Sequence, residues 1–225
     1  SNRITDPGTA ERILAEGMAD MVSLGRVLIA DPDWPLKSKE GRPQEIRPCV
    51  GCMQGCMDKI FTGQPLCCLV NAEAGLEEER EIKPAEQPKK VMVVGSGPGG
   101  MEAARVASAR GHEVVVFEAA AHAGGQVRLT ARQARRREMI SIIDWREAQC
   151  TAKGVDFRFN TWAEVDDVIF ENPDVVIVAT GGMPNTELFE TRGENDHLTT
   201  AWDLISGDVK PAKSVLICDE AGDHP

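Results

Sequence analysis

The stretch Val91-Met92-Val93-Val94-Gly95-Ser96-Gly97-Pro98-Gly99-Gly100 decides the fold of this chain. Its first four residues are an apolar run that predicts a buried strand, and Ala103, Ala104 and Ala107 follow the glycines on a predicted helix. A GxGxxG motif that leaves a strand and opens a helix indicates a dinucleotide-binding loop, whereas isolated glycines of this kind would indicate only a structural turn. The residues predicted to form the loop are Gly95, Gly97, Pro98, Gly99 and Gly100.

The chemistry of this loop depends on its backbone. Gly95 permits the tight turn, Gly97 lets the backbone approach a pyrophosphate, and Gly100 lets the helix pack closely on the strand. The helix N-terminus offers free N–H groups and a positive partial charge to the phosphates. Glu118 ends the second predicted strand, Val114–Phe117, where a carboxylate accepts hydrogen bonds from ribose hydroxyls and repels a 2′-phosphate. We therefore predict binding of the ADP part of FAD, of ADP itself or of NAD, and not of NADP.

The pattern on either side of this unit predicts an α/β fold. Downstream, we expect a long polar helix over about 133–152 and strands over 155–160, 175–179 and 214–218. Upstream, Asp6-Pro7 predicts a helix start and Gly17 its end, followed by a short apolar strand over 21–24 and a second helix before Asp31-Pro32. The order of these elements is that of a doubly wound, Rossmann-like domain preceded by one β/α repeat.

Composition excludes several function classes. The chain has 225 residues, a net charge of -11 and no Tyr, so its core must consist mainly of aliphatic side chains. A polyphosphate backbone would repel this charge, which argues against a nucleic-acid partner. No apolar run approaches the roughly 20 residues that span a bilayer, and no signal peptide is evident, so we predict a cytoplasmic protein without a membrane partner.

Five of the seven cysteines lie within residues 49–68, and four of them can form one site: Cys49, Cys52, Cys56 and either Cys67 or Cys68. With Cys68, the pattern is C-x2-C-x3-C-x11-C, which can supply one thiolate to each iron of a [4Fe–4S] cluster. The spacing lacks the paired C-x2-C knuckles of structural zinc, although a zinc site or a group of free thiols remains an alternative. Cys150 and Cys218 are expected to be small buried hydrophobes.

The remaining conspicuous residues do not indicate a catalytic site. The acidic run Glu77–Glu81 is predicted to be a solvated linker, and the four Trp residues, which lie far apart, are predicted to pack in the core. An arginine group starts the polar helix and is expected to form a solvated or docking face. The histidines have no partner motif. The arginines are Arg132, Arg135, Arg136 and Arg137.

Several of these segments resemble the multidomain NADH:flavin oxidoreductase family, which joins an old-yellow-enzyme-type FMN barrel to a [4Fe–4S] segment and an FAD- or ADP-binding domain. Trimethylamine and histamine dehydrogenases, N-methylproline demethylase and bacterial 2,4-dienoyl-CoA reductase belong to it. The resemblance covers essentially the whole chain. Its motifs are Asn2–Pro7, Ala19–Val22, Gly25-Arg26, Ala30–Pro32, Cys49–Cys56, Cys68–Asn71, Gly124–Gln126 and Ala179–Gly182.

The resemblance implies a role for particular residues. Gly25 and Arg26 would follow the last barrel strand and bind the FMN phosphate, and the match at Cys68–Asn71 implies that Cys68 is the fourth cluster ligand. In the nucleotide-binding domain, one pair would line the pyrophosphate and ribose, one residue would contact adenine through its backbone, and a late loop would lie near the pyrophosphate. These are Gly125 and Gln126, Ala163, and Thr180 and Gly181.

The resemblance also implies a domain order. Residues 1–47 would be the C-terminal end of an FMN-binding TIM barrel, 48–90 the cluster segment and linker, 91–212 the FAD- or ADP-binding domain, and 213–225 the start of a second nucleotide-binding unit. Most of the barrel is missing, so we expect an interior fragment that does not turn over substrate alone. Acidic residues in 219–225 replace the second glycine-rich loop of the reductase branch, which favours the amine-oxidising branch.

The resulting hypothesis is an oxidoreductase that oxidises an amine of the N-methylproline or trimethylamine type, with electrons passing from FMN to the [4Fe–4S] cluster. Its partners would be a small-molecule substrate and an electron-acceptor flavoprotein, and it would form a homo-oligomer. The alternative in the same class is an NADPH-dependent 2,4-dienoyl-CoA or enoate reductase. The alternative of another class is a non-catalytic nucleotide-binding module with structural zinc.

Overall fold

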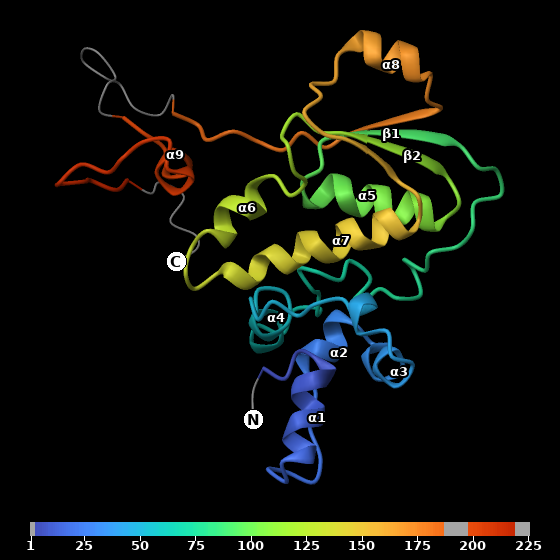
Figure 1. Ribbon diagram of the computed structural model, residues 1–225, viewed down its shortest axis with the longest axis vertical. Helices are drawn as coiled ribbons and strands as arrows, with labels where there is room; N and C mark the ends of the chain where they lie inside the picture. Colours follow the sequence, from blue (N-terminus) through green and yellow to red (C-terminus); the bar gives the residue numbers. More distant parts are fainter. Residues whose placement is uncertain (1–2, 187–197, 219–225) are drawn as a thin grey trace.

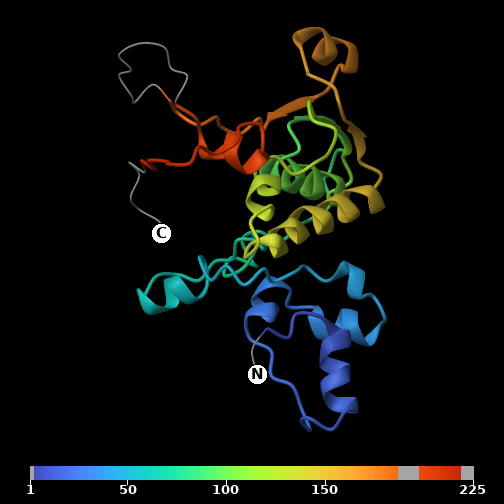
Figure 2. The ribbon, with the colours of Figure 1, turned by 60° about the vertical axis from the view of Figure 1, so that its left-hand side comes forward.

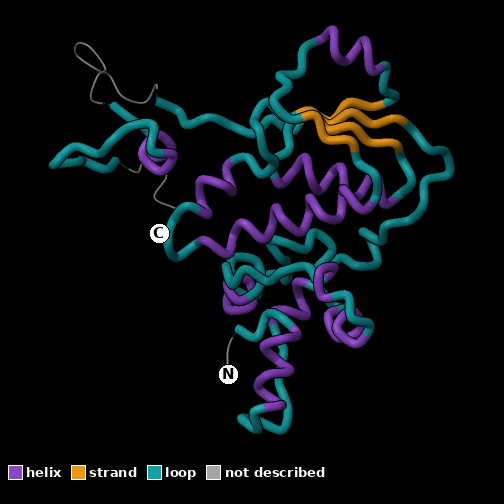
Figure 3. Tube along the Cα trace, viewed as in Figure 1, coloured by secondary structure: helices purple, strands orange, loops and turns teal. Residues whose placement is uncertain are grey.

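A four-stranded parallel sheet forms the centre of the larger part of the molecule (Figures 1 and 3). The computed structural model describes residues 3–186 and 198–218. The strands follow the order β3-β2-β1-β4 and are parallel throughout, with bounds β1 (Lys90–Val94), β2 (Glu113–Phe117), β3 (Asp156–Arg158) and β4 (Val175–Val178). Continuous valine-rich runs suit the two central strands because both faces of the sheet are covered. The predicted doubly wound fold is confirmed.

Helices cover both faces of this sheet. Figure 1 shows α5 (Pro98–Ala109) and α7 (Ser141–Ala152) on one face and α8 (Val165–Glu171) on the other. Ala104 of α5 and Cys150 of α7 pack against Val93 and Val116 on the first face. Met92, Val115 and Phe117 meet Val168 of α8 on the second. The side chains of each strand therefore alternate between two cores.

The expected long helix over 133–152 is shorter in the structure. A first helix, α6 (Gln126–Ala131), is followed by a turn, by the 3-10 helix η2 (Arg137–Ile140) and only then by α7. The arginine-rich residues 132–137 offer no apolar stripe, whereas Met139 and Ile140 of η2 pack against the core. Helix α7 therefore starts where the side chains can be buried.

The N-terminal part forms a separate layer of short helices, lowest in Figure 1. It contains α1 (Pro7–Ala15), α2 (Arg26–Ala30), α3 (Trp34–Lys39) and the 3-10 helix η1 (Pro43–Glu45). Asp6 caps α1 as predicted, because its Oδ1 accepts a hydrogen bond from Thr9 N at 2.8 Å, and Gly17 ends the segment at a φ of 67°.

Two predicted strands are wrong. Residues 21–24 and 214–218 are not strands in the part of the chain that the structure describes. Met21 is 80% exposed and Leu216 is 95% exposed, and neither segment lies beside a strand that could complete its hydrogen bonds. A strand requires a neighbour as well as an apolar sequence. The acidic residues 219–225, and Asn2 of the barrel motif, lie outside the described residues.

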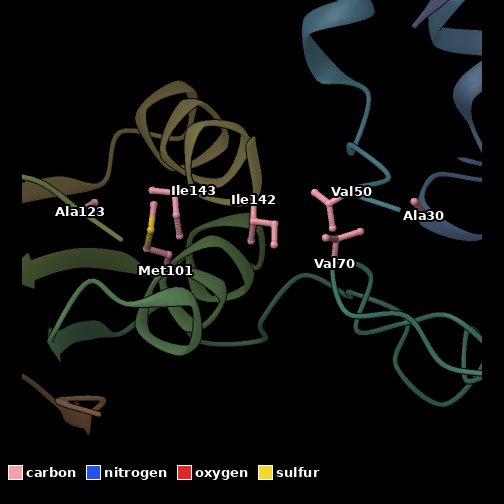
Figure 4. Close-up of a cluster of buried hydrophobic side chains, with 7 residues drawn as sticks. All are labelled: Ala30, Val50, Val70, Met101, Ala123, Ile142 and Ile143. Carbon is pink, nitrogen blue, oxygen red and sulfur yellow. The ribbon is translucent and has the colours of Figure 1, made fainter. Parts of the chain in front are cut away.

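The cysteine-rich segment lies between these two parts, with α4 (Met57–Phe61) projecting from it (Figure 2). A continuous apolar core joins all three layers, and Figure 4 shows Met101, Ile142 and Ile143 on one side facing Val50 and Val70 on the other. Because Val50 and Val70 come from the cysteine-rich segment, that segment is packed on the nucleotide-binding domain and is not a free linker.

Directional contacts fix the same arrangement. Arg146 Nη2 of α7 donates a hydrogen bond to Val70 O at 3.1 Å, and Trp145 Nε1 donates one to Glu45 O at 3.1 Å. Arg146 is itself held by Glu102, at 2.8 Å from its Nε. Although burial opposes it, pairing with Arg105 and Arg146 lowers the pKa of Glu102. Within the described residues, no helix combines the length and apolar character needed to cross a membrane.

Candidate functional site

Four cysteines line one small cavity, called the cysteine cavity below. They are Cys49, Cys52, Cys56 and Cys68. Cys67 is exposed and does not line it. The backbone brings the fourth cysteine to the other three, because Gly55 O accepts a hydrogen bond from Cys67 N at 2.9 Å. This pairing sets Cys56 and Cys68 beside each other although eleven residues separate them in the chain.

The backbone of Cys67 approaches Gly55 closely, and this approach constrains the shape of the cysteine-rich segment. A Cβ at Gly55 would lie 2.6 Å from Cys67 O, so only glycine permits this pairing. Burial raises the pKa of the Cys52 thiol, and the nearby Cys68, Cys56 and Cys49 act in the same direction. Each thiol therefore lies within electrostatic reach of Cys52. Four sulfur donors around one cavity are the donor set of an iron–sulfur cluster.

The ligand role of these cysteines stays a prediction. Among the described residues, no group of three or more His, Cys, Asp or Glu side chains is spaced to hold a metal ion.

The other two cysteines lie apart from the cavity. Cys150 is fully buried as expected, and burial raises the pKa of its thiol to about 12, whereas Cys218 is exposed, contrary to expectation.

The two residues assigned to the FMN phosphate lie beside the cysteine cavity. Gly25 is the N-cap of α2, and Arg26 is its first helical residue. Arg26 lines the cavity, and its Nη1 is 3.9 Å from the position that a Cβ would take at Gly51. The guanidinium thus adds positive charge next to the cysteine loop. The contact of Arg26 with the FMN phosphate stays a prediction.

A second, much larger cavity of about 1060 Å³ lies at the carboxyl ends of the strands, and we call it the glycine-loop pocket. Ligands of open parallel sheets bind at this edge. All but one of the residues predicted for the nucleotide lie on its wall. Those lining it are Gly95, Gly97, Pro98, Gly99, Glu118, Gly125, Gln126, Ala163, Thr180 and Gly181.

The exception, Gly100, lies behind the pocket wall and is buried. A Cβ there would come within 1.9 Å of Gly95 O, which is far inside van der Waals contact. Its predicted role, to let the helix approach the strand, is therefore visible in the geometry. Gly100 shapes the loop and does not itself face the pocket.

Glu118 is held by the glycine loop, a contact that sequence reasoning missed. Its Oε2 accepts hydrogen bonds from Ser96 N at 2.8 Å and Ser96 Oγ at 2.7 Å, while its Oε1 accepts one from Ala120 N at 2.8 Å. Ser96 is fully buried. Glu118 thus joins the ends of β1 and β2, and its carboxylate is fixed on the pocket wall.

Two tryptophans line the pocket, although all four were predicted to pack in the core. Trp34 and Trp145 do so, at 6% and 8% exposure, but Trp162 is 77% exposed on the wall beside Ala163, and Trp202 lines the pocket from α9 (Ala201–Ser206). No local sequence pattern distinguishes the two buried tryptophans from the two that line the pocket. Position after a strand end was the only available hint for Trp162.

The far end of the pocket is tied together by polar contacts. Gln126 Nε2 donates a hydrogen bond to Gly182 O at 2.9 Å, so α6 is joined to the loop after β4. Arg132 Nη1 donates to Ile205 O at 3.4 Å and also to Ser206 O, which attaches α9 to the end of α6. All four arginines, Arg132, Arg135, Arg136 and Arg137, are exposed, as expected for a solvated face, and Arg132 also makes these contacts with α9.

Comparison with known families divides the chain into two matches. Residues 70–205 match the family described as pyridine nucleotide-disulphide oxidoreductase. Residues 1–45 match the NADH:flavin oxidoreductase / NADH oxidase family. The predicted resemblance is confirmed by both, and each match falls on a different layer of the structure.

Individual relatives agree with this division. A protein of Rhizobium meliloti named "Probable N-methylproline demethylase" is 54% identical over 224 residues, which are 99% of this chain and 33% of the relative. The N,N-dimethylglycine/sarcosine dehydrogenase of Chromohalobacter salexigens is 40% identical over 97% of this chain and 33% of its own length. A 2-naphthoyl-CoA reductase structure, 38% identical, superposes with a TM-score of 0.84 over 92% of this chain and 32% of that one. The chain spans about a third of the relatives it matches.

Proposed function

The chain belongs to the pyridine nucleotide-disulphide oxidoreductase family, and we propose on this premise that it is the cluster- and nucleotide-binding portion of an iron–sulfur flavoprotein oxidoreductase. The observation that carries the proposal is the common cavity of Cys49, Cys52, Cys56 and Cys68, in a chain whose second cavity is lined by the glycine loop. In the whole protein, these four cysteines would hold a [4Fe–4S] cluster, and the chemistry that it would supply is single-electron transfer.

The packing of the two sites supports their joint use. Val127 lines the glycine-loop pocket and also packs against the core on which Cys49, Cys52 and Cys68 rest. The same core thus determines the orientation of both sites.

Different residues of the chain would bind the cluster, the FMN phosphate and the nucleotide. The four cysteines would hold the cluster, with Cys67 outside the ligand set, and Arg26 would place positive charge beside it and toward the FMN phosphate. The backbone of the glycine loop and the N-terminus of α5 would hold the pyrophosphate, and Glu118 the ribose. The domain order 1–47, 48–90, 91–212 and 213–225 remains part of this proposal.

We propose oxidative demethylation or dehydrogenation of a secondary or tertiary amine as the reaction of the whole protein. Two of the relatives carry names of this chemistry, an N-methylproline demethylase and an N,N-dimethylglycine/sarcosine dehydrogenase. The whole protein would then pass electrons to an acceptor flavoprotein, act as a homo-oligomer and reside in the cytoplasm. The second candidate is an NADPH-dependent 2,4-dienoyl-CoA or enoate reductase, and the similarity to a 2-naphthoyl-CoA reductase is the observation that supports it.

A single anaerobic experiment separates these candidates. The purified protein that contains this chain is mixed, without oxygen, with N-methylproline, with sarcosine or with NADPH, and flavin absorption is followed. Bleaching by an amine and not by NADPH is the expected result. Rapid bleaching by NADPH alone would establish the reductase, and zinc in place of iron in the same preparation would establish the structural-zinc module.

Glu118 offers a direct test of the nucleotide site. We expect Glu118→Gln to weaken ADP binding roughly tenfold, because hydrogen bonds to a charged group contribute about 1.5–3 kcal/mol. Glu113→Gln is the matched control, since Glu113 is exposed and is the first residue of β2, at the end of the strand opposite to Glu118. Isothermal titration of both variants measures the effect. An unchanged ADP affinity in a folded Glu118→Gln chain would remove the ribose assignment.

A further inference from the structure

The segment over 132–137 concentrates positive charge on an otherwise acidic chain, and we propose that it docks an acidic electron-carrier flavoprotein. This inference rests on the proposed function and names the surface through which its acceptor binds. The chain has a net charge of -11, yet residues 119–137 include five arginines and neither Asp nor Glu. Such a sequence creates a local positive potential that attracts acidic groups.

The arginines at the end of this segment are free to meet a partner. Arg135, Arg136 and Arg137 are exposed, and within the described residues their side chains have no hydrogen bond or ion pair. Arg128 and Arg132, in contrast, donate hydrogen bonds to backbone carbonyls. Three adjacent unpaired guanidinium groups repel one another, and carboxylates of a partner would offset this repulsion through forked hydrogen bonds.

The arginine segment leads directly to the layer that carries the cysteines. It continues into η2, whose Met139 and Ile140 pack against the same core as three of the four cysteines of the cysteine cavity. Figures 1 and 2 both show the start of α7, which follows η2, beside the cysteine-rich segment. A protein bound to these arginines would therefore lie next to the predicted cluster site.

An ion pair ties η2 to the cysteine loop itself. Glu138 of η2 pairs with Arg3 of the N-terminal layer. Arg3 Nη2 lies 3.7 Å from the position that a Cβ would take at Gly51, which separates two of the cavity cysteines. The acidic residue that ends the arginine run is thus already paired, and it does not neutralise the exposed arginines before it.

Apolar side chains around the cysteine cavity complete the surface. Protein interfaces combine an apolar centre with a polar rim. Met53 and Leu69 line the cavity and are 50% and 44% exposed. Helix α4, which starts directly after Cys56, adds Ile60 and Phe61, which are also exposed. The cavity therefore supplies the apolar contact, and the arginines supply the charge.

The rest of the chain favours a small acidic protein over other polyanions. A nucleic acid or an anionic membrane is extended, so it would also face the acidic surface around the segment, which would repel it. A compact carrier can touch the arginines and the cavity alone. Charge pairs at such a rim raise the association rate and remain sensitive to salt, which suits a carrier that must dissociate after each encounter.

The test measures binding of flavodoxin, an acidic FMN protein, to the whole protein that contains this chain, by biolayer interferometry. A variant with both Arg135→Glu and Arg136→Glu should bind at least about tenfold more weakly than the wild type. Raising the salt from about 20 mM to about 300 mM should weaken the wild type by a similar factor and the variant far less. Flavodoxin with amidated carboxylates should not bind.

The matched control carries Lys89→Glu and Lys153→Glu, which change the charge by the same amount at two exposed residues. Lys89 precedes β1, and Lys153 follows α7 at the end opposite to η2. This control should retain affinity within about threefold, because its added charges lie away from the proposed surface. Circular dichroism verifies that both variants are folded, as expected for substitutions at exposed residues.

Equal losses of affinity in the two variants would overturn the inference, as would the absence of flavodoxin binding to the wild type. Arginine-dependent binding of phosphatidylglycerol vesicles or of single-stranded DNA, without binding of flavodoxin, would overturn the choice of a protein partner. Iron and flavin are measured in the same preparation. Their absence would defeat the proposed function, whereas binding that is independent of the arginines in a preparation with its full iron content would defeat this inference alone.

Discussion

Replacing Cys68 by alanine is expected to remove the cluster, whereas replacing its neighbour Cys67 is not. Cys68 lines the cysteine cavity and Cys67 is exposed outside it. A [4Fe–4S] cluster needs one thiolate for each iron, so we expect iron to fall from about four atoms per chain to below about one. Iron and acid-labile sulfide, measured after anaerobic reconstitution, report the result.

The adjacent pair makes this test sharp. Each variant removes one thiol, and the two substituted residues are adjacent in the chain. Expression level and oxidation are therefore expected to be the same for both. Cys49→Ala, Cys52→Ala and Cys56→Ala should behave as Cys68→Ala does. Iron retained in the Cys68 variant and lost in the Cys67 variant would reverse the ligand assignment. Equal, full retention of iron in all five variants would defeat the assignment of these cysteines as the cluster ligands.

Replacing Gly100 by alanine is expected to destabilise the nucleotide-binding domain by roughly 3 kcal/mol, at the upper end of the usual cost of inserting a methyl group into a packed site. The new Cβ would lie 1.9 Å from Gly95 O, so the glycine loop or α5 must move. Because that loop forms the wall of the pocket, ADP binding should be lost together with stability. Urea unfolding and isothermal titration measure the two effects.

Gly99 supplies the control for this prediction. It is the preceding residue of α5, and a Cβ there would meet nothing within 4 Å. Gly99→Ala should therefore leave the free energy of unfolding unchanged or raise it by up to about 1 kcal/mol, because alanine favours the helix. A Gly100→Ala chain as stable as Gly99→Ala would show that the loop can relax and that the close packing does not constrain the fold.

The part of the fold that the sequence predicted is the part encoded by local patterns. The apolar run over 91–94, the glycines after it and Glu118 at the end of the next strand determine backbone shape within a few residues of themselves. The structure places these features as predicted, on β1, on the loop into α5 and at the end of β2. The cap at Asp6 and the end of its segment at Gly17 belong to the same class.

The predicted strands that failed are segments without a neighbouring strand, and no local sequence pattern shows whether such a neighbour is present. Residues 21–24 and 214–218 have the composition of strands, but in the described chain no strand pairs with them. The missed elements, such as α6 and α8, are short and depend on what they cover. An isolated strand or short helix is marginal in water, so tertiary contacts decide whether it forms.

The sequence by itself determined the class of fold, the glycine loop with its acidic partner, and the set of cysteines from which cluster ligands could be drawn. Only the tertiary structure placed Cys68 in the cavity and Cys67 outside it, joined Ser96 to Glu118, and turned Trp162 and Trp202 toward the pocket. The physical reason is the range of the interactions. Periodicity and backbone preference act over a few residues, whereas the surroundings of a side chain depend on segments that packing brings together from distant parts of the chain.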